Sequence, residues 1–188
     1  MKMEWNDHHK LVGQHAYLGA SQFRWLNYSD KKLVDIYNSR MNVLRGTELH
    51  ELAAKAIKIR ERFPKTESAL PRYVNDAIGF GMTPEQILYY SENCFGTADA
   101  IMFRDGMLRI HDLKTGTVPA HMEQLMIYAA LFCLEYHQNP EEIAIELRIY
   151  QNNMVNAYVP SGEEIRTIMN RIIHADEIVR KCKKGEIM

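Results

Sequence analysis

Residues 96–128 have the sequence GTADAIMFRDGMLRIHDLKTGTVPAHMEQLMIY, which indicates the central elements of the fold. Its first two segments, 96–103 and 107–115, are interpreted as strands, and the Arg104-Asp105-Gly106 sequence between them is typical of a hairpin turn. Gly116 ends the second strand, and a helix is expected from about residue 120 to 137. The stretch therefore predicts an antiparallel pair of strands followed by a helix.

A second hairpin and a closing helix are predicted on the C-terminal side. Residues 144–151 and 154–160 flank Asn152-Asn153, a two-residue turn that tolerates positive φ. The Ser161-Gly162-Glu163-Glu164 sequence is a capping box, so a helix is expected to follow it.

The N-terminal side is predicted to be helical. Helices are expected after Ser21, after Asp30, and from about residue 47 to residue 62. Residues 63–86 are interpreted as an insertion of short helices, because Thr83-Pro84-Glu85-Gln86 is another capping-box pattern. Strands follow directly after this insertion. Together these elements predict an α/β fold: a central mixed β-sheet flanked by helices, with an N-terminal helical region.

Composition limits the classes of protein that are compatible with this chain. Its 188 residues suit a single domain, with residues 1–20 as an N-terminal extension. Neither an apolar run of about 18 residues nor the apolar segment of a secretory signal is present, so a cytoplasmic location without a membrane span is expected. The net charge of −1 argues against non-specific nucleic-acid binding by the whole surface, but it leaves a local basic groove open.

Two carboxylates of the central stretch, Asp99 and Asp112, lie on neighbouring predicted strands. Mg²⁺ prefers such oxygen ligands, and a bound ion would polarise a phosphate and activate a water molecule. The carbonyl of Leu113 offers another oxygen. Lys114 shares a strand face with Asp112 and could orient water or stabilise charge on the phosphate. An exposed ion pair is the alternative interpretation of this Asp-Leu-Lys sequence.

Two further positions accompany these carboxylates. Gln124 and Tyr128 are four residues apart on the predicted helix, so they share one face. His50 lies one turn after Gly46 on an earlier helix, where small neighbours leave room for its ring. From that helix alone, a structural or solvated histidine is the favoured interpretation.

These motifs, taken in order, resemble those of the PD-(D/E)XK nuclease superfamily. Within it they are most similar to the RecB-like branch, which includes phage-type and CRISPR-associated exonucleases. The four matching segments are 46–50 (GTELH), 96–99 (GTAD), 112–116 (DLKTG) and 124–128 (QLMIY). The resemblance extends over about residues 21–150, and four motifs in the same order are far more specific than any single one.

The resemblance implies a single nuclease domain over residues 1–188 with a restriction-endonuclease-like core and a Mg²⁺ or Mn²⁺ cofactor. The implied metal-binding residues are His50, Asp99, Asp112 and Leu113; the catalytic residues are Asp99, Asp112 and Lys114; the substrate-binding residues are Gln124, Tyr128 and Thr115. The CRISPR-associated relatives carry a four-cysteine iron–sulfur cluster. Three scattered cysteines cannot supply one, so no iron–sulfur cluster is expected here.

The expected function is divalent-metal-dependent hydrolysis of DNA, with an exonuclease of recombination, repair or phage DNA processing favoured. The cell would be bacterial or phage-infected. A structure-specific endonuclease and a non-catalytic DNA-binding subunit are the alternatives. The joint presence of His50, Asp99, Asp112 and Lys114 argues against the second. DNA is the expected partner. A recombination or helicase protein as a further partner chain and assembly into a homo-oligomer are also considered.

Overall fold

The computed structural model describes residues 10, 16, 18, 20–116 and 118–186, so most of the expected extension at residues 1–20 lies outside the described residues. The chain divides into two compact units, Met1–Leu44 and Arg45–Met188. The first unit contains the 3₁₀ helix η2 (Ala20–Asn27) and the beginning of helix α1 (Asp30–Ile59). The predicted N-terminal helical region is therefore confirmed.

Helix α1 corrects one prediction, because the separate helices expected after Asp30 and from residue 47 are one continuous element. Gly46 lies inside it. A single glycine costs a helix interior only about 1 kcal/mol, and the residues that follow, ELHELAAKAIK, are mostly good helix formers. The helix ends at Ile59, just before Arg60, which has a left-handed φ of 57°.

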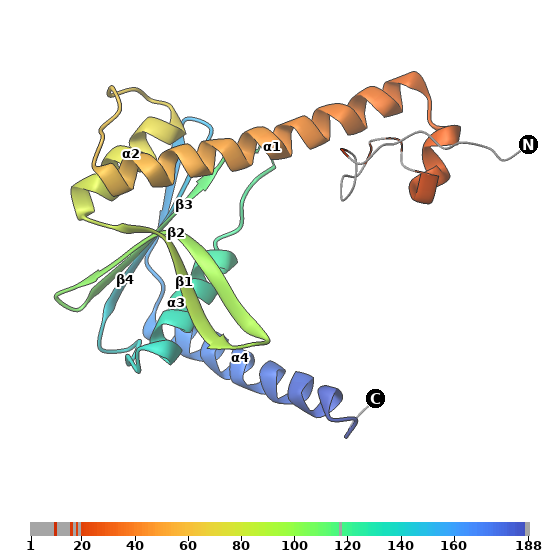
Figure 1. Ribbon diagram of the computed structural model, residues 1–188. Coiled ribbons are helices and arrows are strands. Elements are labelled where there is room, and N and C mark those ends of the chain that lie inside the picture. Colours follow the sequence, from red (N-terminus) through yellow and green to blue (C-terminus); the bar gives the residue numbers. More distant parts are fainter. Residues whose placement is uncertain (1–9, 11–15, 17, 19, 117, 187–188) are drawn as a thin grey trace, which may run out of the picture. The chain divides into compact units, whose positions relative to one another are not determined.

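The second unit is built on a five-stranded mixed sheet, as predicted (Figure 1). Its strands follow one another in space in the order of the sequence, and only β3 and β4 are parallel. The strands are β1 (Thr83–Ser91), β2 (Cys94–Arg104), β3 (Met107–Lys114), β4 (Ala144–Gln151) and β5 (Met154–Tyr158). This arrangement is compatible with a restriction-endonuclease-like fold.

Both predicted hairpin turns are confirmed. Asp105 and Gly106 have φ of 52° and 71° between β2 and β3, and Asn152 has φ of 53° between β4 and β5. Such turns match the twist of the paired strands. The hairpins fix the register of β2 against β3 and of β4 against β5.

The helices after β3 and β5 also agree with prediction. Helix α3 (Glu123–Glu135) is shorter at both ends than expected, and α4 (Gly162–Lys183) begins with the predicted capping box. Ser161 Oγ accepts a hydrogen bond from the Glu164 N–H at 3.2 Å, and Glu164 Oε2 accepts one from the Ser161 N–H at 2.8 Å.

The interpretation of residues 63–86 as several short helices is wrong. A single helix, α2 (Ala69–Phe80), occupies the middle of this segment, and Gly81 ends it with a left-handed φ of 68°. Residues 83–86 belong to β1, where Pro84 is opposite Ala100. Proline is acceptable there because β1 is an edge strand. Pairing with β2 outweighs the local capping-box pattern.

Each face of the sheet has its own hydrophobic core. On one face, α2 and the C-terminal part of α1 pack around Tyr73, Leu113 and Tyr150. On the other face, α3 and α4 pack against a cluster that includes Leu88 and Ala98. None of the helices within the described part of the chain is long and apolar enough to cross a membrane.

Candidate metal centre

Three potential metal ligands from three different elements meet beside the sheet. His50 of α1, Glu85 of β1 and Asp99 of β2 each offer one ligand atom, and these atoms lie within 4.8 Å of one another. His50 Nδ1 is 3.2 Å from Asp99 Oδ2. The structure therefore brings together two predicted ligands, His50 and Asp99, whose positions in the sequence are almost fifty residues apart.

Glu85 is the member of this group that the sequence does not predict. Its capping-box pattern indicates a helix start, whereas the register pairs Pro84 with Ala100 and Gln86 with Ala98, so Glu85 lies across from Asp99. The only signal in the sequence that could have placed Glu85 on a strand is its position directly before β-rich residues. Two carboxylates opposite each other on antiparallel strands repel, and a cation would relieve that repulsion.

The backbone is irregular at the same level of the sheet. Glu85 has φ of 54°, which is unusual for a residue with a side chain. Ala98 packs in the core beneath α3 and α4, but Ala100 packs in the core beneath α1 and α2. Strict alternation would have placed both alanines on one face. The strands therefore depart from regular geometry where Glu85 and Asp99 present their carboxylates, a pattern common at functional sites.

Asp112 lies deeper, at 1% exposure, on β3. Lys114 Nζ donates a hydrogen bond to Asp112 Oδ1 at 3.2 Å and forms an ion pair with Oδ2 at 3.0 Å. Lys114 Nζ is not oriented to donate a hydrogen bond to Oδ2 as well, so Oδ2 has no hydrogen-bond partner among the described residues. Burial, followed by the charge of Asp99, raises the pKa of Asp112 to about 6. A buried, incompletely satisfied carboxylate suits a site that receives a cation.

Asp112 is not part of the compact group of three, but it is electrostatically linked to it. Its charge contributes to a raised pKa of His50, for which the hydrogen bond with Asp99 is the largest cause. Leu113, the residue after Asp112, contacts Asp99 through its backbone N–H, which donates a hydrogen bond to Asp99 Oδ2 at 2.9 Å. This contact differs from the predicted one, in which the Leu113 carbonyl binds the metal. Metal binding by the Leu113 carbonyl stays a prediction.

The predicted substrate-binding residues of α3 continue from Lys114 as a chain of hydrogen bonds. Gln124 Oε1 accepts from Lys114 Nζ at 2.8 Å, and Gln124 Nε2 donates to the Tyr128 hydroxyl at 3.1 Å. The i, i+4 spacing on α3 thus places both side chains beside the catalytic-lysine candidate. These hydrogen bonds connect residues 112–116 with residues 124–128, the third and fourth matching segments.

Two glycines explain why the motifs approach so closely. A Cβ atom added to Gly46 would lie 2.8 Å from Thr115 Oγ1, and one added to Gly96 would lie 2.9 Å from the ring of Tyr128. Gly46 therefore lets α1 pack against the end of β3, and Gly96 lets α3 pack against β2. Thr115, a predicted substrate-binding residue, is exposed beside this contact.

Gly96→Val is expected to displace Tyr128 and to lower the free energy of unfolding by about 1 to 3 kcal/mol, as overpacking commonly does. Urea unfolding monitored by circular dichroism measures this change. Gly116→Val is the matched control, because an added Cβ there meets no described atom within 4 Å and its backbone is not left-handed. Equal stability of the two variants would contradict the close packing inferred at Gly96.

Glu85→Gln is expected to raise the melting temperature of the metal-free protein at pH 8 and to weaken Mn²⁺ binding by at least about 10-fold, since even the loss of an outer-shell partner has an effect of that size. Burial and the facing Asp99 raise the pKa of Glu85, which means that its charge is unfavourable in the folded state. Differential scanning fluorimetry and isothermal titration calorimetry check the two effects. Glu48→Gln, an exposed position on the same helix as His50, should leave both quantities unchanged.

Comparison with known proteins assigns no activity to this arrangement. No curated protein matches the chain. A family model described as a protein of unknown function (DUF2800) matches residues 85–176. The matched segment includes Glu85, Asp99, Asp112 and Lys114, and it leaves His50 outside.

Proposed function

We propose that the chain is a divalent-metal-dependent deoxyribonuclease of the RecB-like PD-(D/E)XK type. The observation that carries this proposal is the meeting of His50, Glu85 and Asp99 next to the Asp112–Lys114 pair. One helix, α1, and three strands, β1, β2 and β3, supply these groups. The order and chemistry of His50, Asp99, Asp112 and Lys114 agree with the motifs that suggested a nuclease.

The donor set suits Mg²⁺ or Mn²⁺. It is dominated by carboxylate oxygens, with one imidazole, and the unsatisfied Asp112 Oδ2 supplies a further acceptor for a cation. His50, Glu85, Asp99 and Asp112 would hold the ion. When bound, the ion would polarise the scissile phosphate and lower the pKa of an attacking water molecule.

The protein groups around this position have distinct roles in the proposal. Lys114 holds its ammonium within reach of both Asp112 and Gln124, where it can stabilise negative charge that develops on phosphate oxygens. Gln124 and Tyr128 restrict the position of that ammonium through their hydrogen bonds and offer polar groups to the substrate. His50 and the Leu113 N–H fix the orientation of Asp99.

Cleavage of end-labelled linear DNA and of covalently closed circular DNA, each with Mg²⁺ or Mn²⁺, tests the proposal. Degradation of linear DNA alone supports an exonuclease, as we propose for recombination, repair or phage DNA processing in the cytoplasm of a bacterial or phage-infected cell. Cleavage of closed circles would assign an endonuclease instead. Failure of the purified protein to cut either substrate, while it binds Mn²⁺ normally, would overturn the proposed reaction.

A further inference from the structure

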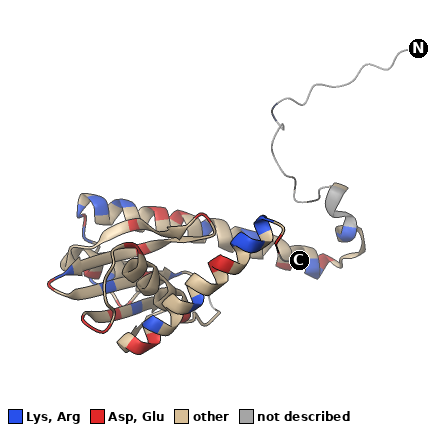
Figure 2. Ribbon diagram, turned by 90° about the horizontal axis from the view of Figure 1, so that it is seen from below, with Lys and Arg blue, Asp and Glu red and all other residues tan. Residues whose placement is uncertain are grey.

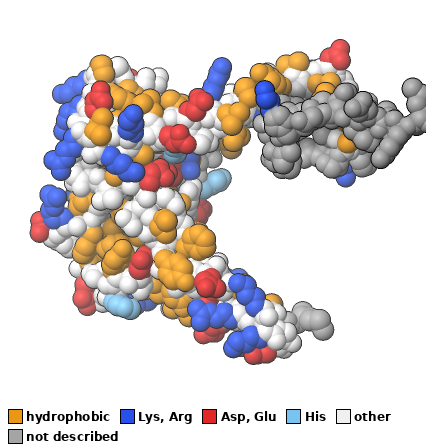
Figure 3. Space-filling model, viewed as in Figure 1, with side chains coloured by type: hydrophobic (Ala, Val, Ile, Leu, Met, Phe, Trp, Pro, Cys, Tyr) orange, Lys and Arg blue, Asp and Glu red, His pale blue; other side chains and the backbone are white. Residues whose placement is uncertain are grey.

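The face of the sheet that carries Glu85 and Asp99 continues along β1 and β2 as an exposed strip. The register places Ile87 opposite Thr97 and Tyr89 opposite Phe95. Leu88 and Ala98 point to the core beneath α3 and α4, so the residues that alternate with them point away from it. Ile87, Tyr89 and Phe95 are exposed by 57%, 46% and 62%. Figure 3 shows hydrophobic side chains gathered over this hairpin.

The end of the strip is a pair of stacked aromatic rings. The ring centroids of Tyr89 and Phe95 are 6.4 Å apart, and their planes differ by 27°. From Asp99 to Phe95 the strand advances by about 13 Å, at about 3.3 Å per residue. That distance corresponds to roughly four nucleotides stacked at about 3.4 Å each. The strip thus joins the candidate metal centre to two open aromatic faces.

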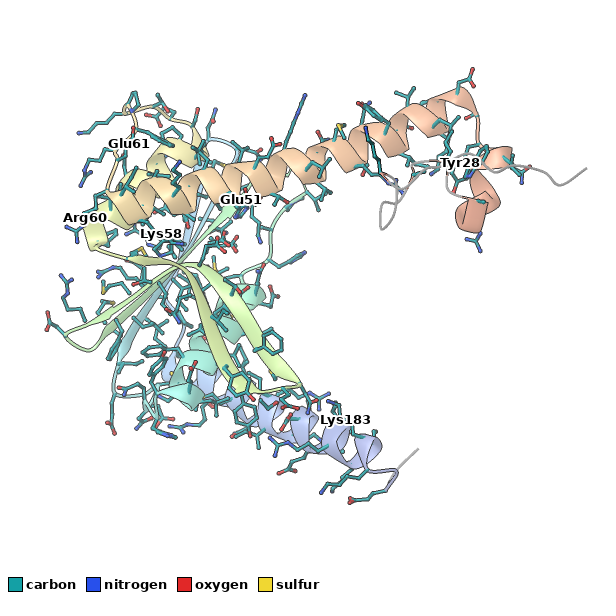
Figure 4. The ribbon with its side chains drawn as sticks, viewed as in Figure 1. Tyr28, Glu51, Lys58, Arg60, Glu61 and Lys183 are labelled. Atoms are coloured by element: carbon teal, nitrogen blue, oxygen red, sulfur yellow. The ribbon has the colours of Figure 1, made fainter. Side chains whose placement is uncertain are left out.

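Cationic side chains lie beside the aromatic pair. A cleft of about 430 Å³ is lined by Tyr89, by the hairpin tip, and by Arg180, Lys183 and Lys184 of the end of α4. Glu92 of the tip also lines this cleft. Figure 2 shows Lys and Arg at the C-terminal end of α4, and Figure 4 shows Lys183 next to the hairpin. The cleft therefore combines an aromatic wall with positive charge.

The hairpin tip is held firmly against α4. Asp176, which is only 4% exposed, accepts hydrogen bonds from Ser91 Oγ at 2.6 Å and from Asn93 Nδ2 at 2.8 Å. Lys183 Nζ also donates to Asn93 Oδ1. These contacts fix the aromatic pair relative to the basic end of the helix, so a ligand would meet a formed surface rather than one that must be ordered first.

We infer that this surface binds single-stranded nucleic acid, with bases stacked on Tyr89 and Phe95 and phosphates beside the basic end of α4. Rings that stack on bases next to cations are the recurring means of holding single strands without sequence preference. Continuity with Glu85 and Asp99 on the same sheet face favours this occupant over a second protein. This inference rests on the proposed function, because the surface would lead a nucleic-acid strand to the metal centre.

The test is binding of a fluorescein-labelled oligothymidylate, measured by fluorescence anisotropy in EDTA with the whole chain. Tyr89→Ala/Phe95→Ala is expected to weaken binding by at least about 5-fold, which is the lower limit for the removal of stacking with a single base. Tyr89→Trp/Phe95→Trp should retain it, and Tyr158→Ala, an exposed tyrosine on β5, is the matched control. Lys183→Gln/Lys184→Gln should lower the salt slope by about 0.7 for each phosphate that the variant no longer neutralises.

Unchanged binding by the double alanine variant would overturn the inference, as would equal affinity for duplex DNA. A change of its oligomeric state in sedimentation, without a change in binding, would assign the strip to a second copy of the chain and would also overturn it. Because the assay contains no divalent metal, it is independent of the proposed reaction. A protein that cuts DNA but ignores the Tyr89 and Phe95 changes refutes the strip alone. A protein with normal strip-dependent binding and no cleavage refutes the nuclease alone.

Discussion

Asp112→Asn is expected to abolish metal-dependent cleavage and, in the same protein, to raise the stability of the metal-free state. Loss of a buried ligand and of the partner of Lys114 should lower the cleavage rate by at least about 10³-fold, the equivalent of several kcal/mol of transition-state stabilisation. The stability effect has the opposite sign, because the Asp112 side chain is almost completely buried and its charge is unfavourable there without a cation.

The sign follows from the pKa of Asp112, which is about 6 in the folded protein against an ordinary value of 3.8. Between these two values the folded state holds a proton that the unfolded state has released. The contribution of Asp112 to stability is therefore most favourable below about pH 4, where both states are protonated, and it is lost as the pH rises through 6. Above that pH the charge costs folding about 3 kcal/mol, which the neutral asparagine avoids.

Thermal unfolding in EDTA at pH 8 measures this effect. The melting temperature of Asp112→Asn is expected to rise by about 2 to 4 °C for each kcal/mol of added stability. The difference between Asp112→Asn and wild type should shrink towards pH 5, where wild-type Asp112 becomes neutral. Asp105→Asn, at the exposed turn between β2 and β3, provides the control. Lower stability of Asp112→Asn at pH 8 would show that the Lys114 ion pair outweighs burial and Asp99 repulsion, contrary to the sign expected from the raised pKa.

Lys114→Met is expected to lower the cleavage rate by about 10² to 10⁴-fold while Mn²⁺ affinity remains within about tenfold of wild type. The methionine preserves much of the side-chain length and removes the ammonium that contacts Asp112 and Gln124. Rates under saturating metal and Mn²⁺ titration calorimetry separate the two quantities. Lys55→Met, an exposed position on α1, is the matched control. A variant that cuts as fast as wild type would remove Lys114 from the catalytic group.

Most of the sheet, apart from the beginning of β1, was predictable because its signals are local. Asp105-Gly106 and Asn152 adopt the positive φ that their turns require, and the Ser161–Glu164 capping box forms as expected. The sequence also indicates the candidate site residues of β2, β3 and α3, which are Asp99, Asp112, Lys114, Gln124 and Tyr128. Their spacing alone places Asp112 and Lys114 on one strand and Gln124 and Tyr128 on one helical face.

Two features were beyond the local signals. The continuity of α1 depends on whether a glycine interrupts a helix. Gly46 does not interrupt it, because a single glycine costs only about 1 kcal/mol among good helix formers. Glu85 enters the site only through pairing of β1 with β2, which overrides a capping-box pattern that is valid in isolation. Long-range register thus determines the group of potential ligands more than any single motif does.

Anomalous diffraction from crystals grown with Mn²⁺ tests the proposed metal centre without reference to activity, since it locates the ion itself. We expect one anomalous difference peak within about 2.6 Å of carboxylate oxygens of Asp99 and Glu85 and close to the His50 ring. A peak found only elsewhere on the chain, or no peak beside His50, Glu85 and Asp99 at saturating Mn²⁺, would contradict the proposed metal centre.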